Sequence, residues 1–300
     1  MEIVEYKGWK RNVRLANGAI ELVATLDIGP RIIHLAAPGG RNVFKNYVEQ
    51  MGKTGEAEWQ IRGGHRLWVA PEDPVATYFP DNSPVDVEEI RGGVRLRPAP
   101  EKPNGLQKEM DIALDAARPR VRVTHRLKNV GKKPLTLAPW ALSVMAPGGT
   151  AVVSLPPRGS HPRDLLPNQQ LVLWPYTDLG DPRIRLSARS ILLSQRADMG
   201  PTKLGLLNLD GWAAYSVHGC LFVKRFACSA GADYPDMGCN TELFTNADML
   251  EVESLALLAT LAPGARVEHV EQWQLFADVP PLKSAADVET HVRPLVEKDS

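Results

Sequence analysis

Apolar and polar residues alternate with a period of two along most of this chain, and this pattern constrains the fold more than any other feature. In the run 120–127, Val121, Val123, His125 and Leu127 alternate with charged or polar neighbours. Successive side chains of a strand point to opposite faces, so the pattern predicts strands with one buried face. Similar runs recur to residue 276, and 24 glycines and 25 prolines separate them. The chain is therefore predicted to be all-β, with a sandwich or barrel-like architecture.

Two further patterns complete the predicted organisation. Residues 129–134 predict a hairpin connection into the run 135–146. Ser284–Glu297 predicts a short C-terminal helix on the sheet edge, because Ser284 can cap it and apolar residues share one face. Pro294 is expected to end or distort the last turn. No repeat or linker divides the chain, so residues 1–300 are predicted to form a single domain.

Composition excludes several classes of function. Thirty-five basic residues balance 35 acidic ones, which leaves no basic excess for a nucleic-acid partner. No run approaches 18 apolar residues, so no membrane span is expected, and the N-terminus lacks a secretory signal. Three cysteines without a CxxC pair fit a reducing compartment, so a cytoplasmic location is expected. No phosphate-binding glycine loop, GxSxG or HExxH motif is found, and we expect no cofactor.

The segment 61–72 combines a double glycine with side chains suited to a polyol. Arginine and glutamate can bind hydroxyls, and tryptophan can stack on a sugar face, while glycine lets the backbone approach a ligand closely. The residues concerned are Arg62, His65, Arg66, Trp68 and Glu72. The alternative interpretation is a glycine turn before an ordinary strand.

Acidic residues mark two later segments. In 234–242, Asp236, Asn240 and Glu242 either line a site or satisfy a Pro-Asp-x-Gly turn, and the turn is favoured. In 249–255, Glu251 and Glu253 lie on one face of a strand, roughly 6.6 Å apart. Facing water they form a solvated face; facing a cleft, their repulsion raises the pKa of one carboxyl and supplies an acid or base.

Metal binding is not indicated by the spacing of the histidines. The seven histidines are dispersed and no pair has ligand spacing, so no histidine-built metal site is predicted. A calcium ion held by carboxylates of several strands is left open.

These segments together resemble a known superfamily. Arg62-Gly63-Gly64, Asn129-x-Gly131-x-x-Pro134 and Glu251 followed by Leu261-x-Pro263-Gly264 occur in the order found in galactose mutarotase-like proteins, which include aldose 1-epimerases and glucose-6-phosphate 1-epimerases. The resemblance covers roughly residues 15 to 276 and is strongest to a branch with GG-x-RLW-x-APE and Y-x-D-x-GCN-x-E-x-FT signatures. It implies a β-supersandwich with a carbohydrate site on its concave sheet.

The resemblance also implies roles for individual residues. Glu251 occupies the place of the general base, Glu253 falls where many aldose epimerases have glutamine, and Arg31 matches an early G-x-R-I pattern. Arg62 stands where aldose epimerases carry histidine and phosphosugar epimerases carry arginine, which makes an anionic sugar a candidate ligand.

One departure from the family pattern concerns the general acid. The family histidine is expected within residues 137–143, and this chain has none there. His65 is the predicted substitute, with Glu72 or Glu242 as second choices, and Trp140 is predicted to be a stacking platform.

Three hypotheses follow. The first is a carbohydrate-binding epimerase with Glu251 as base and His65 as acid. Its predicted binding residues are Arg31, Arg62, Arg66, Trp68, Glu72, Trp140, Asp236, Asn240, Glu242 and Glu253. The second is a non-catalytic sugar sensor, and the third is a glycoside lyase or hydrolase that uses the same carboxylates.

Overall fold

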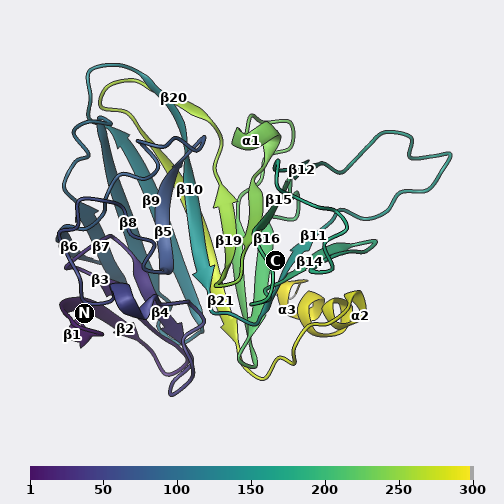
Figure 1. Cartoon of the computed structure of the whole chain (residues 1–300), viewed down its shortest axis with the longest axis horizontal. Coiled ribbons are helices and arrows are strands. Elements are labelled where there is room, and N and C mark those ends of the chain that lie inside the picture. The colour runs from purple at the N-terminus through teal and green to yellow at the C-terminus, as the bar shows by residue number, and fades with distance from the viewer. Residues whose placement is uncertain (298–300) are drawn as a thin grey trace.

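A computed structural model describes residues 1–297 as two antiparallel β-sheets that pack face to face (Figure 1). The first sheet runs in the order β1-β2-β3-β4-β5-β10-β19-β18-β15-β12, and β20 pairs with β10 beside this path. Its strands are β1 (Glu2–Tyr6), β2 (Trp9–Ala16), β3 (Glu21–Thr25), β4 (Ile32–Ala36), β5 (Gly64–Ala70), β10 (Leu135–Met145), β12 (Leu171–Leu173), β15 (Thr202–Leu206), β18 (Thr241–Thr245), β19 (Leu250–Leu255) and β20 (Ala259–Leu261).

The second sheet runs in the order β13-β14-β11-β16-β17-β21-β9-β8-β7-β6. Its strands are β6 (Val85–Ile90), β7 (Gly93–Pro98), β8 (Leu106–Leu114), β9 (Arg120–Asn129), β11 (Thr150–Ser154), β13 (Ile184–Leu186), β14 (Ser190–Ser194), β16 (Trp212–Val217), β17 (Cys220–Phe226) and β21 (Arg266–Phe276). The prediction of an all-β fold is therefore confirmed, because the inward side chains of both sheets form one large apolar core.

The connection 129–134 differs from the prediction. The strands it joins, β9 and β10, belong to different sheets and do not pair with each other. The predicted hairpin is therefore wrong, and the segment is a corner that carries the chain from the second sheet to the first. Asn129 holds this corner, since its side-chain amide donates to the carbonyls of Lys133 and Leu261.

The C-terminal helix is present, and its start is as predicted. Ser284 and Asp287 form a reciprocal capping box at the start of α2 (Ala285–Asp287). A π-helical turn at Val288–Val292 then leads into α3 (Arg293–Glu297), so the helix is distorted just before Pro294. Its apolar side covers the outer face of the second sheet, with Val288, Val292 and Val296 on Val152, Leu192 and Val223. The predicted position at a sheet edge is therefore wrong.

Two shorter elements and one long loop complete the chain. They are a 3₁₀ turn at Val48–Gln50, the short helix α1 (Pro235–Gly238) and an exposed loop at 157–170 that projects from the molecule between β11 and β12 (Figure 1). In residues 1–297, no helix has the length and apolar character needed to cross a membrane.

Candidate functional site

A pocket of about 240 Å³ lies on the face of the first sheet that points away from the second sheet. Strands β5, β10, β15, β18 and β19 form its floor, and loops from elsewhere in the chain form its walls. Its lining residues are Trp59, Ile61, Arg66, Trp68, Glu72, Tyr78, Trp140, Leu142, Tyr176, Lys203, Phe244, Met249 and Glu251. The pocket combines aromatic faces with charged groups, as carbohydrate and other small-molecule sites do.

Strand register determines which side chains share this floor. Glu253 of β19 lies opposite Leu142 of β10 on one side and opposite Glu242 of β18 on the other. Leu142 in turn lies opposite Arg66 of β5. Directly paired residues point to the same face, so Arg66, Glu253 and Glu242 form one row, and Glu251 lies two residues along β19 on the same face.

Glu251 and Arg66 form the central ion pair of the pocket. The two side chains approach to 2.9 Å, and the residues are only 7% and 2% exposed, respectively. Arg66 also stacks on the rings of Trp68 and Trp59, at 4.2 and 5.3 Å from the ring centroids. Burial raises the pKa of Glu251, and the guanidinium of Arg66 opposes that rise. Glu251 is therefore a carboxyl that reaches the pocket with its pKa shifted toward neutrality.

Lys203 holds a second cluster of charges next to this pair. Its ammonium lies 2.6 Å from Glu242 and 3.2 Å from Glu253, and Trp140 donates from Nε1 to Glu253 at 2.8 Å. Burial works against the charge of Lys203, but Glu253 and Glu242 raise its pKa above the ordinary value. Burial raises the pKa of Glu242 well above that of a free glutamate. The cluster thus holds a charged lysine between two buried carboxyl groups, and burial raises the pKa of one of them, Glu242.

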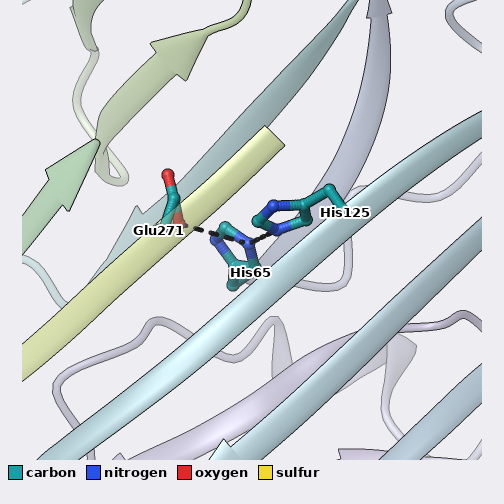
Figure 2. A group of neighbouring side chains, drawn as sticks. All are labelled: His65, His125 and Glu271. Carbon is teal, nitrogen blue, oxygen red and sulfur yellow. Dashed lines mark hydrogen bonds and ion pairs between the residues drawn. The ribbon is translucent and has the colours of Figure 1, made fainter. Parts of the chain in front are cut away.

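His65 is not part of the pocket. It precedes Arg66 on β5, so its side chain points to the opposite face, into the core between the sheets. Figure 2 shows it there between His125 and Glu271. Its Nε2 lies 2.7 Å from Nε2 of His125, and its Nδ1 lies 2.9 Å from the hydroxyl of Ser143. Because the sheet separates His65 from Glu251, the predicted acid–base pairing of these two residues is not formed.

His65 belongs to a fully buried polar cluster under the pocket floor. Lys224 of β17 lies 2.7 Å from Glu271 and donates to the carbonyls of Val252 and Ala141 at 3.0 and 3.3 Å. These two carbonyls belong to β19 and β10, so the ion pair supports the strands that carry the pocket residues. Glu271 also accepts from Ser254 at 2.5 Å and from Nε1 of Trp273 at 2.7 Å.

The same cluster offers ligand atoms of His65, His125 and Glu271 within 4.8 Å of one another. These ligand atoms already form hydrogen bonds with one another or with neighbouring protein groups. His125 donates from Nδ1 to the carbonyl of His269, so its Nε2 accepts from Nε2–H of His65. Both carboxylate oxygens of Glu271 are bonded, one of them to Lys224. The donor set therefore fits a hydrogen-bond network better than a metal site.

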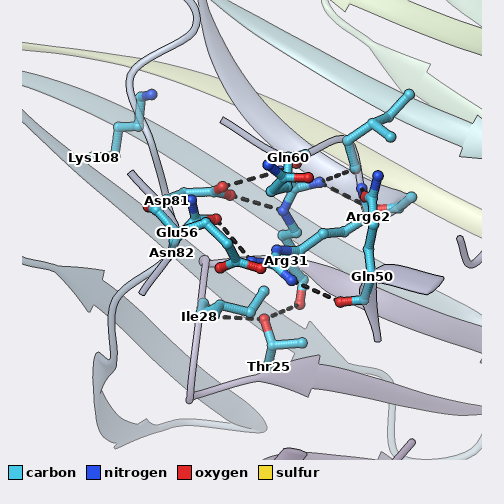
Figure 3. A network of polar contacts seen from close by, with 12 residues as sticks. Thr25, Ile28, Arg31, Gln50, Glu56, Gln60, Arg62, Asp81, Asn82 and Lys108 are labelled. Carbon is cyan, nitrogen blue, oxygen red and sulfur yellow. Dashed lines mark hydrogen bonds and ion pairs between the residues drawn. The ribbon is translucent and has the colours of Figure 1, made fainter. Parts of the chain in front are cut away.

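Arg31 and Arg62 are not exposed to the pocket either. Figure 3 shows both within one network of polar contacts. Arg31 pairs with Asp81 at 2.8 Å and donates to the carbonyls of Gln60 and Ile61. Arg62 pairs with Glu56 at 2.6 Å and donates to Asn82 and to loop carbonyls. Their hydrogen bonds hold the segment that presents Trp59 and Ile61 to the pocket. The two arginines therefore support the pocket wall and do not contact a ligand as predicted.

The double glycine is explained by backbone contact rather than by a ligand. Gly63 has φ +92°, and a Cβ there would lie 2.0 Å from the carbonyl oxygen of Lys45. A Cβ at Gly64, which has φ +72°, would lie 2.5 Å from the carbonyl oxygen of Ile32. Close packing of neighbouring segments therefore requires glycine at both positions.

Replacement of Gly63 by alanine is expected to lower the free energy of unfolding by more than about 2 kcal/mol, because a left-handed conformation alone costs about 1–2 kcal/mol. The clash with Lys45 adds to that cost. Gly55→Ala is the matched control, since its φ is +77° and nothing lies within 4 Å of the added carbon. Urea denaturation of both variants checks this, and an equal loss in the two would show that the contact with Lys45 does not matter.

The remaining predicted residues divide between the pocket and the turn. Trp68, Trp140 and Glu72 line the pocket, as noted above. Asp236 lies in the turn with φ +51°, as the favoured interpretation predicted, and Asn240 is buried and exchanges hydrogen bonds with Asn208. Asp236 and Asn240 therefore shape the loop rather than the pocket.

Several pocket residues were missed by sequence reasoning. Trp59, Tyr78 and Tyr176 come from loops and give no periodic signal. Lys203 had a usable signal, because it is the one charged residue in the otherwise apolar or small segment 201–207. A charge in such a strand is rare unless it is paired or functional.

Comparison with known proteins adds the fold family. No protein-family model and no curated protein matches the chain. Among solved structures, it is similar to the Slr1438 protein of Synechocystis, with a TM-score of 0.60 and 12% identity over 92% of this chain and all of that one. A galactose mutarotase-like protein of Lactobacillus casei has a TM-score of 0.58 at 12% identity, over 88% of this chain and all of that one. A galactose mutarotase related enzyme of Lactobacillus acidophilus has a TM-score of 0.56 at 10% identity, over 91% and 100%. The chain thus has the galactose mutarotase-like fold, which confirms the fold that the resemblance implied.

Proposed function

We propose that this protein binds a carbohydrate in the pocket on the first sheet and catalyses its anomerisation with Glu251 as general base. The observation that carries the proposal is the carboxyl of Glu251 in the pocket floor, among aromatic side chains that can stack on a sugar ring. Its raised pKa suits a base that works near neutral pH. The similarity in fold to a galactose mutarotase-like protein and to a galactose mutarotase related enzyme supports the same class of function.

The proposed chemistry moves two protons. Glu251 takes the proton of the anomeric hydroxyl, the bond between the anomeric carbon and the ring oxygen breaks, and the ring oxygen takes up a proton. The open-chain aldehyde then rotates and closes from the other face, which returns both protons. Lys203 is the proposed donor to the ring oxygen, because it lines the pocket as a charged group whose charge Glu253 and Glu242 stabilise. Each of the two groups contributes roughly 10²–10⁴-fold to such a step.

A second candidate function is sugar binding without catalysis. It is favoured by one observation: within residues 1–297, none of the seven histidines lies among the pocket residues. Lysine with a raised pKa is a weaker acid than histidine at neutral pH, so a pocket of this composition also suits a sensor.

Replacement of Glu251 by glutamine is expected to reduce anomer interconversion by at least about 10²-fold, while ligand affinity changes only a few-fold. Glutamine keeps the shape of the side chain and its contact with Arg66 but cannot take a proton. NMR exchange measures the interconversion, calorimetry measures the affinity, and Glu5→Gln is a control on the exposed strand β1. Undiminished turnover in Glu251→Gln would contradict the assignment of the base. Binding with no turnover in the unaltered protein would instead support the sensor.

A further inference from the structure

Carboxyl groups outnumber cations in and directly behind the pocket. The cations are Arg66 and Lys203, whereas the carboxyls are Glu72, Glu242, Glu251 and Glu253. Glu253 contributes to the raised pKa of Glu242 and of Glu251, after the larger effect of burial. A ligand that carried negative charge would therefore enter a site that already holds an excess of it.

Glu72 is the carboxyl that remains available for a ligand. The inner carboxyls are bonded to Arg66 or Lys203, as described above. Glu72 lies exposed at the edge of the pocket, where it accepts from the hydroxyl of Tyr78. Within the described part of the chain, it forms no ion pair.

Arg66 points to the second ligand contact. It is 2% exposed, and its Nη2 donates to Glu251, whereas its Nε and Nη1 have no hydrogen-bond partner among residues 1–297. Buried donors without a partner are costly, so they indicate an acceptor that arrives with a ligand. A hydroxyl oxygen satisfies them without adding charge. A carboxylate or phosphate would also bond them, but it would lie beside the carboxylate of Glu251.

We propose that the pocket selects an amino sugar, a hexosamine whose hydroxyls accept from Arg66 and whose ammonium group lies next to Glu72. This inference rests on the proposed carbohydrate function of the same pocket and names its substrate class. It replaces the anionic sugar expected from the sequence, because Arg62, which carried that expectation, is already paired with Glu56.

Calorimetric titration with matched sugars tests the proposal. The titrations compare glucosamine, glucose, N-acetylglucosamine, glucuronate and glucose 6-phosphate, and the corresponding galactose compounds. They are made at about pH 6.5, where an amino group is protonated. The hexosamine is expected to bind about three- to ten-fold more tightly than its parent hexose, as one partly exposed ion pair allows. The N-acetyl derivative, which has no positive charge, loses this advantage, and the two anionic sugars bind more weakly than the hexose.

Two variants assign the preference to Glu72. In Glu72→Gln, hexosamine and hexose are expected to bind with equal affinity, so the three- to ten-fold preference is lost. Glu88→Gln removes the same charge from the exposed face of β6 in the second sheet and leaves the preference intact.

The outcomes separate this inference from the proposed function. Tighter binding of an anionic sugar, equal binding of hexosamine and hexose, or a preference that survives Glu72→Gln would overturn the amino-sugar inference and still support a carbohydrate pocket. Failure of every sugar to bind would overturn both.

Discussion

Replacement of Lys224 by methionine is expected to lower the free energy of unfolding by about 3–5 kcal/mol, the usual cost of removing one partner from a buried ion pair. Lys224 and Glu271 are both fully buried, and their charged groups lie 2.7 Å apart. Burial opposes the charge of Glu271, but Lys224 holds the pKa of Glu271 below its ordinary value. Methionine fills a similar volume, so the expected loss comes mainly from the uncompensated carboxylate.

A double-mutant cycle with Glu271→Gln separates this charge effect from packing. The variant Lys224→Met/Glu271→Gln is expected to recover most of the loss, because no charge then remains buried without a partner. The loss in Lys224→Met should also shrink as the pH falls, because without Lys224 the folded variant protonates Glu271 at a higher pH than the unaltered folded protein does. Urea denaturation of the four proteins measures these values. Additive effects of the two substitutions would show that the pair is not coupled.

Acidification below pH 6.5 is expected to destabilise the protein steeply. Burial lowers the pKa of His65 well below its usual range, that of His125 to about 4 and that of His269 to about 3. All three are therefore neutral in the folded state, whereas in the unfolded chain they take up protons near pH 6.5. Since the unfolded state then binds more protons, the free energy of unfolding falls by about 1.4 kcal/mol per proton and per pH unit.

Glu242 and Glu251 act in the opposite direction over part of this range. Burial raises their pKa values, so they bind protons in the folded state first, which stabilises it as the pH falls. The net slope is therefore expected to correspond to between one and three protons, or about 1.4–4 kcal/mol per pH unit between pH 6.5 and about 4.5.

The slope of unfolding free energy against pH, obtained from urea denaturation, tests this expectation. In His125→Asn one titrating group is removed while the donor to the carbonyl of His269 is kept, so the slope should fall by about one proton. His161→Asn, in the exposed loop 157–170, is the control and should keep the full slope. A slope unchanged by His125→Asn would mean that the buried histidines do not cause the acid sensitivity.

Periodicity was sufficient for the fold class and for part of the pocket. Alternation along β19 places Glu251 and Glu253 on one face, and the register with β5 brings Arg66 to the same side. The same rule puts His65 and Arg66 on opposite faces of β5, so strand geometry argues against the use of both in one pocket. The prediction of His65 as the general acid followed the family pattern and did not take account of that alternation.

The corner at 129–134 and the location of the C-terminal helix show a different limit. A turn sequence predicts a reversal of the chain but not which strand becomes the neighbour, since β10 pairs with β5 and β19 rather than with β9. An apolar helix face predicts burial but not the surface that covers it.

The all-β class, the strand faces and the cap at Ser284 could be predicted from the sequence, because they depend on neighbours within a few residues. The ion pairs required the three-dimensional structure: Arg31 pairs with Asp81, Arg62 with Glu56, and Lys203 with Glu242 and Glu253. The contacts of Arg31 and Lys203 join residues far apart in the chain, and Arg62 meets Glu56 through the path of an irregular loop. The partner that a buried charge finds therefore depends on how the strands pair and the loops pack.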